Sequence, residues 1–198
     1  FIKKTNVDGS LVKIAGGEYG NISLSGDTVA FSLVGGKADT VTLGGKADSA
    51  ILSFLDCHVA ELTVESKAAN TLEIELNAAI DCFTLQENAA KSLTIHLGKV
   101  ENSEIILKTD AKSSTLLYDA KETPMALVEK IRGLFDKVSA TKTAYLAAGG
   151  TGTGFSRQNP AGDLVTAFNY VTDGGEVVLL SDFTLDCVTV LPNSEHEV

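Results

Sequence analysis

The sequence repeats itself about every 21 residues between Asn21 and Tyr118. Each repeat has two apolar residues two positions apart, with Thr between them in three repeats and Ile106 in the fourth, followed by a small or polar stretch with an alanine at a fixed place. The aligned blocks begin at Val41, Leu62, Phe83 and Ile105. Such a repeat is interpreted first as a stack of structural units, because one unit is too short to bury its own apolar residues.

A second series of apolar residues lies between those blocks. Its members are pairs two residues apart, which begin at Phe31, Leu52, Leu72 and Leu93. Alternation over such short runs is the period of a β-strand with one buried face. Each repeat is therefore predicted to hold two short strands and two turns. Stacked in register, the blocks form a parallel β-solenoid of four to five coils that begins at Ile22.

Two other architectures fit part of this pattern. A leucine-rich repeat has units of similar length but needs an Asn or Cys at a fixed turn position, and the turn residues here change between repeats. An antiparallel sandwich suits the strand spacing but does not explain the self-similarity. We therefore expect a mostly β fold, a parallel β-solenoid or β-helix with one or two short capping helices.

An amphipathic helix is predicted over residues 124–138. Thr123 is a typical N-cap residue, and Pro124 suits the first helical position. The apolar residues on one helical face are Leu127, Val128, Ile131, Leu134, Phe135 and Val138. Since a solenoid end exposes apolar surface and unpaired strand edges, capping is the favoured role, and a spacer between two domains is the alternative.

The chain is accordingly divided into three parts. Residues 1–118 form the β-solenoid repeat region, in which residues 1–20 are an opening part-coil. Residues 119–142 form the amphipathic capping or linker helix. Residues 143–198 form the start of a second, truncated β-helix.

The last part has its own order of elements. The expected elements are a short strand at 144–148, a glycine-rich stretch at 149–154, an Asn-Pro pair at 159–160, a helix at 162–171 and two further strands within 176–191. In this order and spacing, residues 143–191 resemble the N-terminal segment of right-handed parallel β-helix proteins of the pectate-lyase-like group. The resemblance implies that the helix plugs the first coil. Because that family's catalytic residues lie on later coils, it transfers none of them to this chain.

Composition limits the classes of partner. A net charge of −10 opposes nucleic-acid binding, because a binder must neutralise phosphates with Lys and Arg. No apolar run reaches 18 residues, so no membrane-spanning segment is predicted. The chain begins without Met and both ends look cut, so we expect a fragment or processed portion of a longer secreted protein without its signal peptide.

The cysteines Cys57, Cys82 and Cys187 are expected to be buried or half-buried free thiols. They form no CxxC pair, and only His58 lies near one of them, so no metal site is predicted. The glycine-rich stretch Gly149–Gly154 lacks the Lys of a phosphate-binding loop, and the helix does not follow it directly. It is therefore interpreted as a turn that leads into a capping helix.

Two outward-facing patterns on the repeats are candidate sites. Thr42, Thr63 and Thr84 form one column, for which a hydrated β-face is favoured over ice binding because a second threonine column is missing. Glu73 and Glu75 lie on one strand, with His96 beside Glu75 on the next coil. Paired acids suit glycoside chemistry, but an open face favours a solvated surface pair.

We therefore expect a non-catalytic structural or adhesive module of a secreted or cell-surface bacterial protein, because solenoids form stiff rods with repeated surfaces. One alternative is an accessory region of a polysaccharide lyase or glycoside hydrolase whose catalytic β-helix lies beyond Val198, and another is a self-assembling extracellular filament subunit. No catalytic, cofactor-binding or metal residue is predicted. The expected partners are other domains of a longer chain, other protein subunits or carbohydrate, and not nucleic acid.

Overall fold

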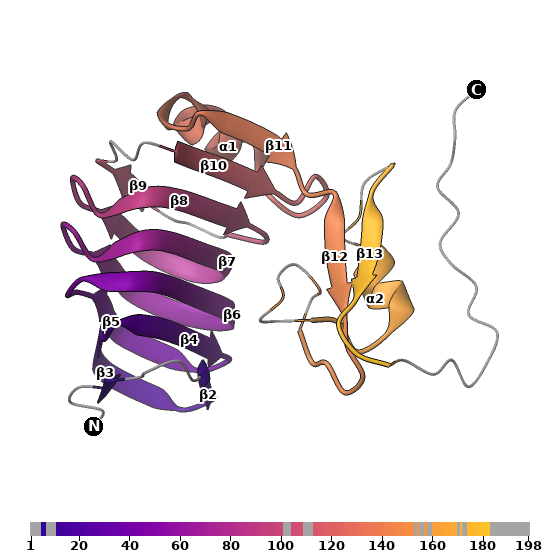
Figure 1. Cartoon of the computed structure of the whole chain (residues 1–198), viewed down its shortest axis with the longest axis horizontal. Coiled ribbons are helices and arrows are strands. Elements are labelled where there is room, and N and C mark those ends of the chain that lie inside the picture. The colour runs from indigo at the N-terminus through magenta and orange to yellow at the C-terminus, as the bar shows by residue number, and fades with distance from the viewer. Residues whose placement is uncertain are drawn as a thin grey trace. The chain divides into compact units, whose positions relative to one another are not determined.

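The computed structural model describes residues 5–6, 11–100, 104–108, 113–152, 154, 157, 160–169, 171 and 174–182. It is mostly β, with 60% strand and two short α-helices. The predicted parallel β-solenoid is confirmed, with about six turns at a spacing of about 21 residues. The chain forms two compact units, residues 1–117 with 122–138 and residues 118–121 with 139–198 (Figure 1).

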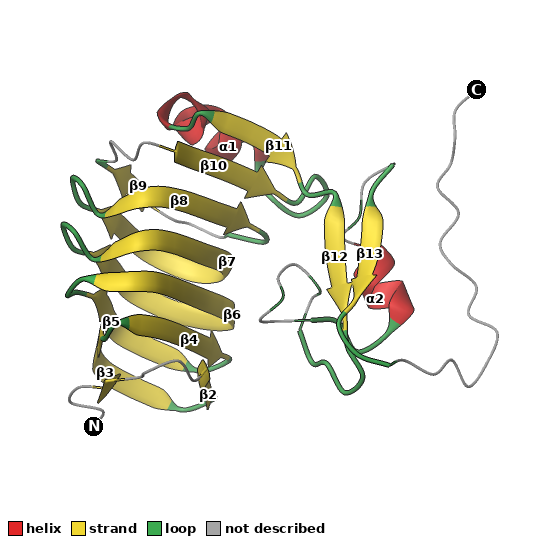
Figure 2. Ribbon diagram, in the orientation of Figure 1, coloured by secondary structure: helices red, strands yellow, loops and turns green. Residues whose placement is uncertain are grey.

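An 11-stranded sheet builds the solenoid (Figure 2). Its strands are β1 (Thr5–Asn6), β2 (Leu11–Ala15), β3 (Glu18–Ser25), β4 (Thr28–Val34), β5 (Lys37–Leu43), β6 (Ala47–Val64), β7 (Ala69–Leu85), β8 (Ala90–Leu97), β9 (Glu104–Leu107), β10 (Ser113–Tyr118) and β11 (Lys137–Ala140). From β1 to β9, each strand pairs in parallel with its equivalent in the next coil. This parallel pairing excludes the antiparallel sandwich.

One interior column lies as the repeat predicts. Val41 pairs with Leu62, and Leu62 pairs with Phe83, each one repeat further along the chain. All three side chains are fully buried. The stack also extends toward the N-terminus, where β2 pairs with β4, so it holds more coils than the four to five expected from the repeat.

The second predicted series is out of register between β6 and β7. Leu52 pairs with Ile74 and not with Leu72, because paired residues in this half of the coil are offset by slightly more than one repeat. A register shift between Leu55 and His58 restores the repeat spacing further on. The larger offset before that shift places Ser53 beside Glu75 and not beside Glu73.

Each central coil is one long bent strand, not two separate strands as predicted. The bend in β6 lies at Asp56, whose φ is 48°. In the preceding coil the same corner is formed by Gly35 and Gly36, with φ of 65° and 76°. A Cβ at Gly36 would clash with the backbone of the coil before it. Glycine fits this corner because it has no Cβ and adopts positive φ without strain.

The helix predicted over 124–138 is wrong in its second half. Helix α1 spans Met125–Ile131, a 3-10 turn spans Arg132–Leu134, and strand β11 follows. Val128 and Ile131 are buried, but Leu134 is 45% exposed. The chain leaves the helix because Asp136 accepts hydrogen bonds from the backbone N–H and the hydroxyl of Ser114, at 2.8 and 3.0 Å. The backbone groups of β11 are then satisfied by pairing with β10.

Thr123 does not cap α1 as its sequence position suggests. Pro124 occupies the N-cap position, without a side-chain hydrogen bond. The hydroxyl of Thr123 instead donates to the carbonyl oxygens of Leu97 and Gly98, at 2.7 and 3.0 Å. These carbonyls lie where β8 ends, so the threonine fixes the start of α1 against the coil stack.

The second unit contains a parallel strand pair, β12 (Thr143–Leu146) and β13 (Glu176–Leu179), with helix α2 (Leu164–Asn169) between them in sequence. Its core is formed by Ala144, Leu146, Ala161 and Ala167, against which Leu164, Val171 and Val177 pack. The predicted strand, helix and strand are thus present, with narrower bounds. The second of the two strands predicted within 176–191 lies outside the described residues.

Close backbone packing accounts for the glycines that follow β12. The N–H of Gly152 donates to the carbonyl oxygen of Pro160 at 3.0 Å. A Cβ at Gly150 would lie 2.5 Å from the carbonyl oxygen of Ala161, and one at Gly162 would clash with Gly150. These close contacts explain why Gly150 and Gly162 carry no side chain.

Candidate functional site

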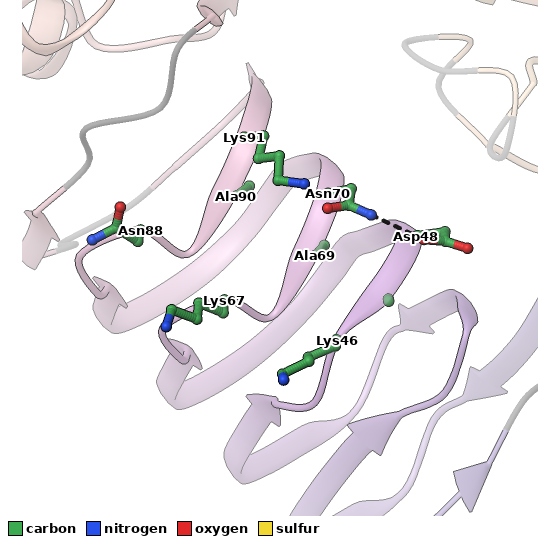
Figure 3. A pocket seen from close by; sticks show the side chains of 9 residues that line it. Lys46, Asp48, Lys67, Ala69, Asn70, Asn88, Ala90 and Lys91 are labelled. Atoms are coloured by element: carbon green, nitrogen blue, oxygen red, sulfur yellow. Dashed lines mark hydrogen bonds between the residues drawn. The ribbon is translucent and has the colours of Figure 1, made fainter.

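A groove of about 560 Å³ crosses three consecutive coils where β6, β7 and β8 begin (Figure 3). We call it the lysine groove. Its lining residues are Lys46, Ala47, Asp48, Lys67, Ala69, Asn70, Asn88, Ala90 and Lys91. All belong to the solenoid unit, and the sequence analysis did not predict a site there.

Alanine side chains form the floor of the lysine groove. Ala47 pairs with Ala69, and Ala69 pairs with Ala90, so the three methyl groups form one column along the stack. They are 1%, 6% and 7% exposed. The backbone beside them is tied between coils, for example by the hydrogen bond from Ala47 N–H to Ala68 O at 2.9 Å. The floor is therefore narrow, apolar and fixed by the backbone.

Two rows of polar side chains flank this floor. Figure 3 shows Lys46, Lys67 and Asn88 in one row and Asp48, Asn70 and Lys91 in the other. All six are exposed.

The turn conformation fixes the first of these rows. Lys67 and Asn88 occupy equivalent turns and adopt the left-handed conformation, with φ of 59° and 54°. Their backbones are linked, because the N–H of Lys67 donates to the carbonyl oxygen of Asn88 at 2.8 Å. Asparagine tolerates this conformation better than most residues.

The lysine groove is locally cationic on an acidic protein. Its lining carries three ammonium groups and one carboxylate, whereas the whole chain has a net charge of −10. The carboxylate of Asp48 accepts a hydrogen bond from the amide of Asn70 at 2.9 Å. None of the three ammonium groups forms an ion pair with any residue that the structure describes. Their charge therefore faces solvent across the groove.

A second polar cluster lies in register across β6, β7 and β8. The hydroxyl of Ser53 donates to Oε2 of Glu75 at 2.7 Å, and Glu75 pairs with His96 in the next coil. Nε2 of His96 lies 3.0 Å from Oε1 of Glu73. Ser53, Glu75 and His96 are 1%, 2% and 8% exposed.

This burial corrects the sequence interpretation. Glu75 and His96 are neighbours, as expected, but they are not a solvated surface pair. A buried carboxylate needs hydrogen-bond partners to offset its lost hydration, and Ser53 supplies one. The hydrogen bond from Ser53 therefore holds this carboxylate in place between two coils, which suits a structural role.

Cys57 and Cys82 are free thiols, as the sequence predicted. Cys57 is buried and Cys82 is half-buried. Burial is the main cause that raises the pKa of Cys57 to about 12. This thiol is therefore protonated and unreactive near neutral pH. Cys187 lies outside the described residues.

Two further outward positions behave differently. Thr42, Thr63 and Thr84 pair in register, as predicted, and each is half-buried. His58 has a neighbour that the sequence analysis missed, because its Nε2 lies 2.9 Å from Oδ2 of Asp81. Both side chains are well exposed, so the contact contributes little to stability.

No family model, curated protein or solved structure matches the chain. The fold defines a parallel β-solenoid protein, and the resemblance of residues 143–191 to pectate-lyase-like proteins stays a prediction. Within the described residues, no group of three or more His, Cys, Asp and Glu side chains is placed to hold a metal ion. No described helix is long and apolar enough to span a membrane.

Proposed function

We propose that the chain is a non-catalytic structural or adhesive module of a secreted or cell-surface bacterial protein. The coil stack is the observation that carries this proposal. Apolar columns such as Val41–Leu62–Phe83 run through successive coils, and each strand bonds to the next coil along its length. Because every strand is paired along its length with the next coil, the stack resists bending, and each coil adds one more outer face.

Side chains on the outer surface also link the coils. The hydroxyl of Thr40 donates to Asn21 at 3.0 Å, and the amide of Asn70 donates to Asp48 at 2.9 Å. The partners in each pair are 19 and 22 residues apart, so both bonds connect one coil to the next. The polar cluster around Glu75 forms hydrogen bonds inside the stack in the same way. These features support a mechanical role over a catalytic one.

Two measurements test the proposal. Antibodies raised against the purified chain should label intact cells of the source organism, and labelling only after permeabilisation would exclude a surface role. The purified chain should also leave pectin, alginate and chondroitin intact, as followed by reducing-end release and by ultraviolet absorbance of unsaturated sugars. Cleavage of any of these polymers would exclude the non-catalytic assignment.

The second candidate is an accessory region of a polysaccharide lyase or glycoside hydrolase. It is favoured by the second unit, in which β12, α2 and β13 form a parallel strand–helix–strand unit with a common core. This is the arrangement implied by the pectate-lyase-like resemblance. Intact mass and sequencing of the natural polypeptide test it: further coils with clustered acidic and basic residues would support it, and a polypeptide that ends near Val198 would exclude it.

A further inference from the structure

We propose that the lysine groove binds an acidic glycan, meaning a linear sugar chain that carries carboxylate or sulfate groups. The inference rests on the adhesive role proposed above and names its ligand class. It is carried by the cationic lining, the apolar floor and the regular spacing of the groove.

The ammonium groups lie on both sides of the groove, with Lys46 and Lys67 in one row and Lys91 in the other. Lys46, Lys67 and Lys91 belong to three consecutive coils. Neighbouring strands lie about 4.8 Å apart, so the three lysines span about 10 Å along the stack. A chain with an anionic group on successive units can meet these charges one after another. A single small anion would meet only part of this cationic lining.

The floor and the amides suit a sugar chain. The column of Ala47, Ala69 and Ala90 forms a floor without bulky side chains, so a sugar chain can approach between the two polar rows. Asn70 and Asn88 flank it with amides, which both donate and accept hydrogen bonds as hydroxyl groups require. A groove of about 560 Å³ is also within the size range of ligand sites in proteins.

A nucleic acid fits the same groove less well. The lining contains no aromatic side chain on which bases could stack. The net charge of −10 also repels the phosphate backbone outside the groove. The net charge opposes any polyanion outside the groove, so the lack of a stacking surface in the lining is what favours an acidic glycan over a nucleic acid.

The test is isothermal titration calorimetry with four probes of similar length. These are a sulfated heparin-derived oligosaccharide, an oligogalacturonate, a neutral cello-oligosaccharide and single-stranded oligo-dT. We expect one or both acidic sugars to bind, and the one that binds identifies sulfate or carboxylate as the preferred group. Binding should weaken as salt rises, because salt screens exposed charges.

A triple variant removes the charges and keeps the fold. Lys46→Gln and Lys91→Gln replace exposed side chains, and Lys67→Asn places asparagine where the next coil has Asn88 in the same left-handed conformation. Loss of three exposed charge pairs predicts about tenfold weaker binding. The matched control replaces Lys37, Lys130 and Lys137 by Gln, which are exposed and lie outside the groove.

Thermal melting establishes that the variants are folded, and the single variant Lys46→Gln gives the same test if the triple variant does not fold. The inference is overturned if the groove variant binds the acidic sugar as tightly as the control. It is also overturned if the neutral sugar binds equally well, or if oligo-dT binds more tightly, which would assign the groove to nucleic acid. If the chain binds no acidic glycan but antibodies against it still label intact cells, this inference is overturned and the proposed surface role is not.

Discussion

Truncation of one buried leucine tests the packing of the coil stack. Leu62 is fully buried and pairs with Val41 on one side and Phe83 on the other. The substitution Leu62→Ala therefore removes apolar groups from the centre of an interior column. Leu11→Ala is the matched control, because Leu11 lies on β2 and is 45% exposed.

The expected loss in the free energy of unfolding follows from the burial of Leu62. Each buried methylene is worth about 0.8 kcal/mol, so the loss of three carbon atoms costs about 2.4 kcal/mol in transfer free energy. The cavity left among paired strands raises the total to about 3–4 kcal/mol, because backbone hydrogen bonds on both sides prevent collapse. The control should lose less than about 1 kcal/mol, since surface changes have small effects.

Urea unfolding followed by circular dichroism measures both variants. With a slope of about 2 kcal/mol per molar urea, Leu62→Ala should lower the midpoint by about 1.5–2 M. The slope should not change if the native surface is retained. A loss in Leu62→Ala no larger than in Leu11→Ala would refute the packing of this column.

Three further outcomes are expected from the same unfolding assay. Ser53→Ala should cost about 1–3 kcal/mol, because the buried carboxylate of Glu75 loses a hydrogen bond, and an effect equal to that of a surface substitution would count against this. Gly36→Ala should destabilise the fold strongly, since its φ is 76° and a Cβ would clash with the preceding coil, whereas Gly133→Ala meets no atom within 4 Å and should be mild. The folded-state pKa of Cys57 is raised from 9.0 to about 12, so its contribution to stability is present below pH 9 and is lost as pH rises toward 12. Comparison with Cys57→Ala isolates this contribution, and an identical alkaline decline in both proteins would contradict it.

The sequence predicted the column of Val41, Leu62 and Phe83 correctly because alternation and spacing report directly on one buried strand face. It did not predict the register of Leu52 with Ile74. Leu43 pairs with Val64 but Ala47 pairs with Ala69, so the extra residue enters at the turn before β7, and the shift between Leu55 and His58 removes it again. Both changes lie at turns or corners, where spacing changes without altering the apolar alternation. Local pattern determines which residues face inward, whereas the register across a corner depends on backbone geometry.

Other differences arise from tertiary contacts. Apolar periodicity predicts a helix through residue 138, but hydrogen bonds between Asp136 and Ser114 favour a strand there. Alternation placed Glu75 on the outward face without indicating that this face is covered. The lysine groove was missed because its signal, a lysine in each of three coils, is visible only once the alanine column between them is known.

The coil length has a consequence for growth of the stack. Ile22 pairs with Val41 in an early coil, and Phe83 pairs with Ile105 in a late one, so the later coil contains more residues than the earlier one. The number of residues per coil therefore increases along the chain, and the early and late coils are not interchangeable. A duplicated coil would fit best beside coils of its own length. Two copies placed end to end would join a shorter coil to a longer one, so the stack has a built-in direction.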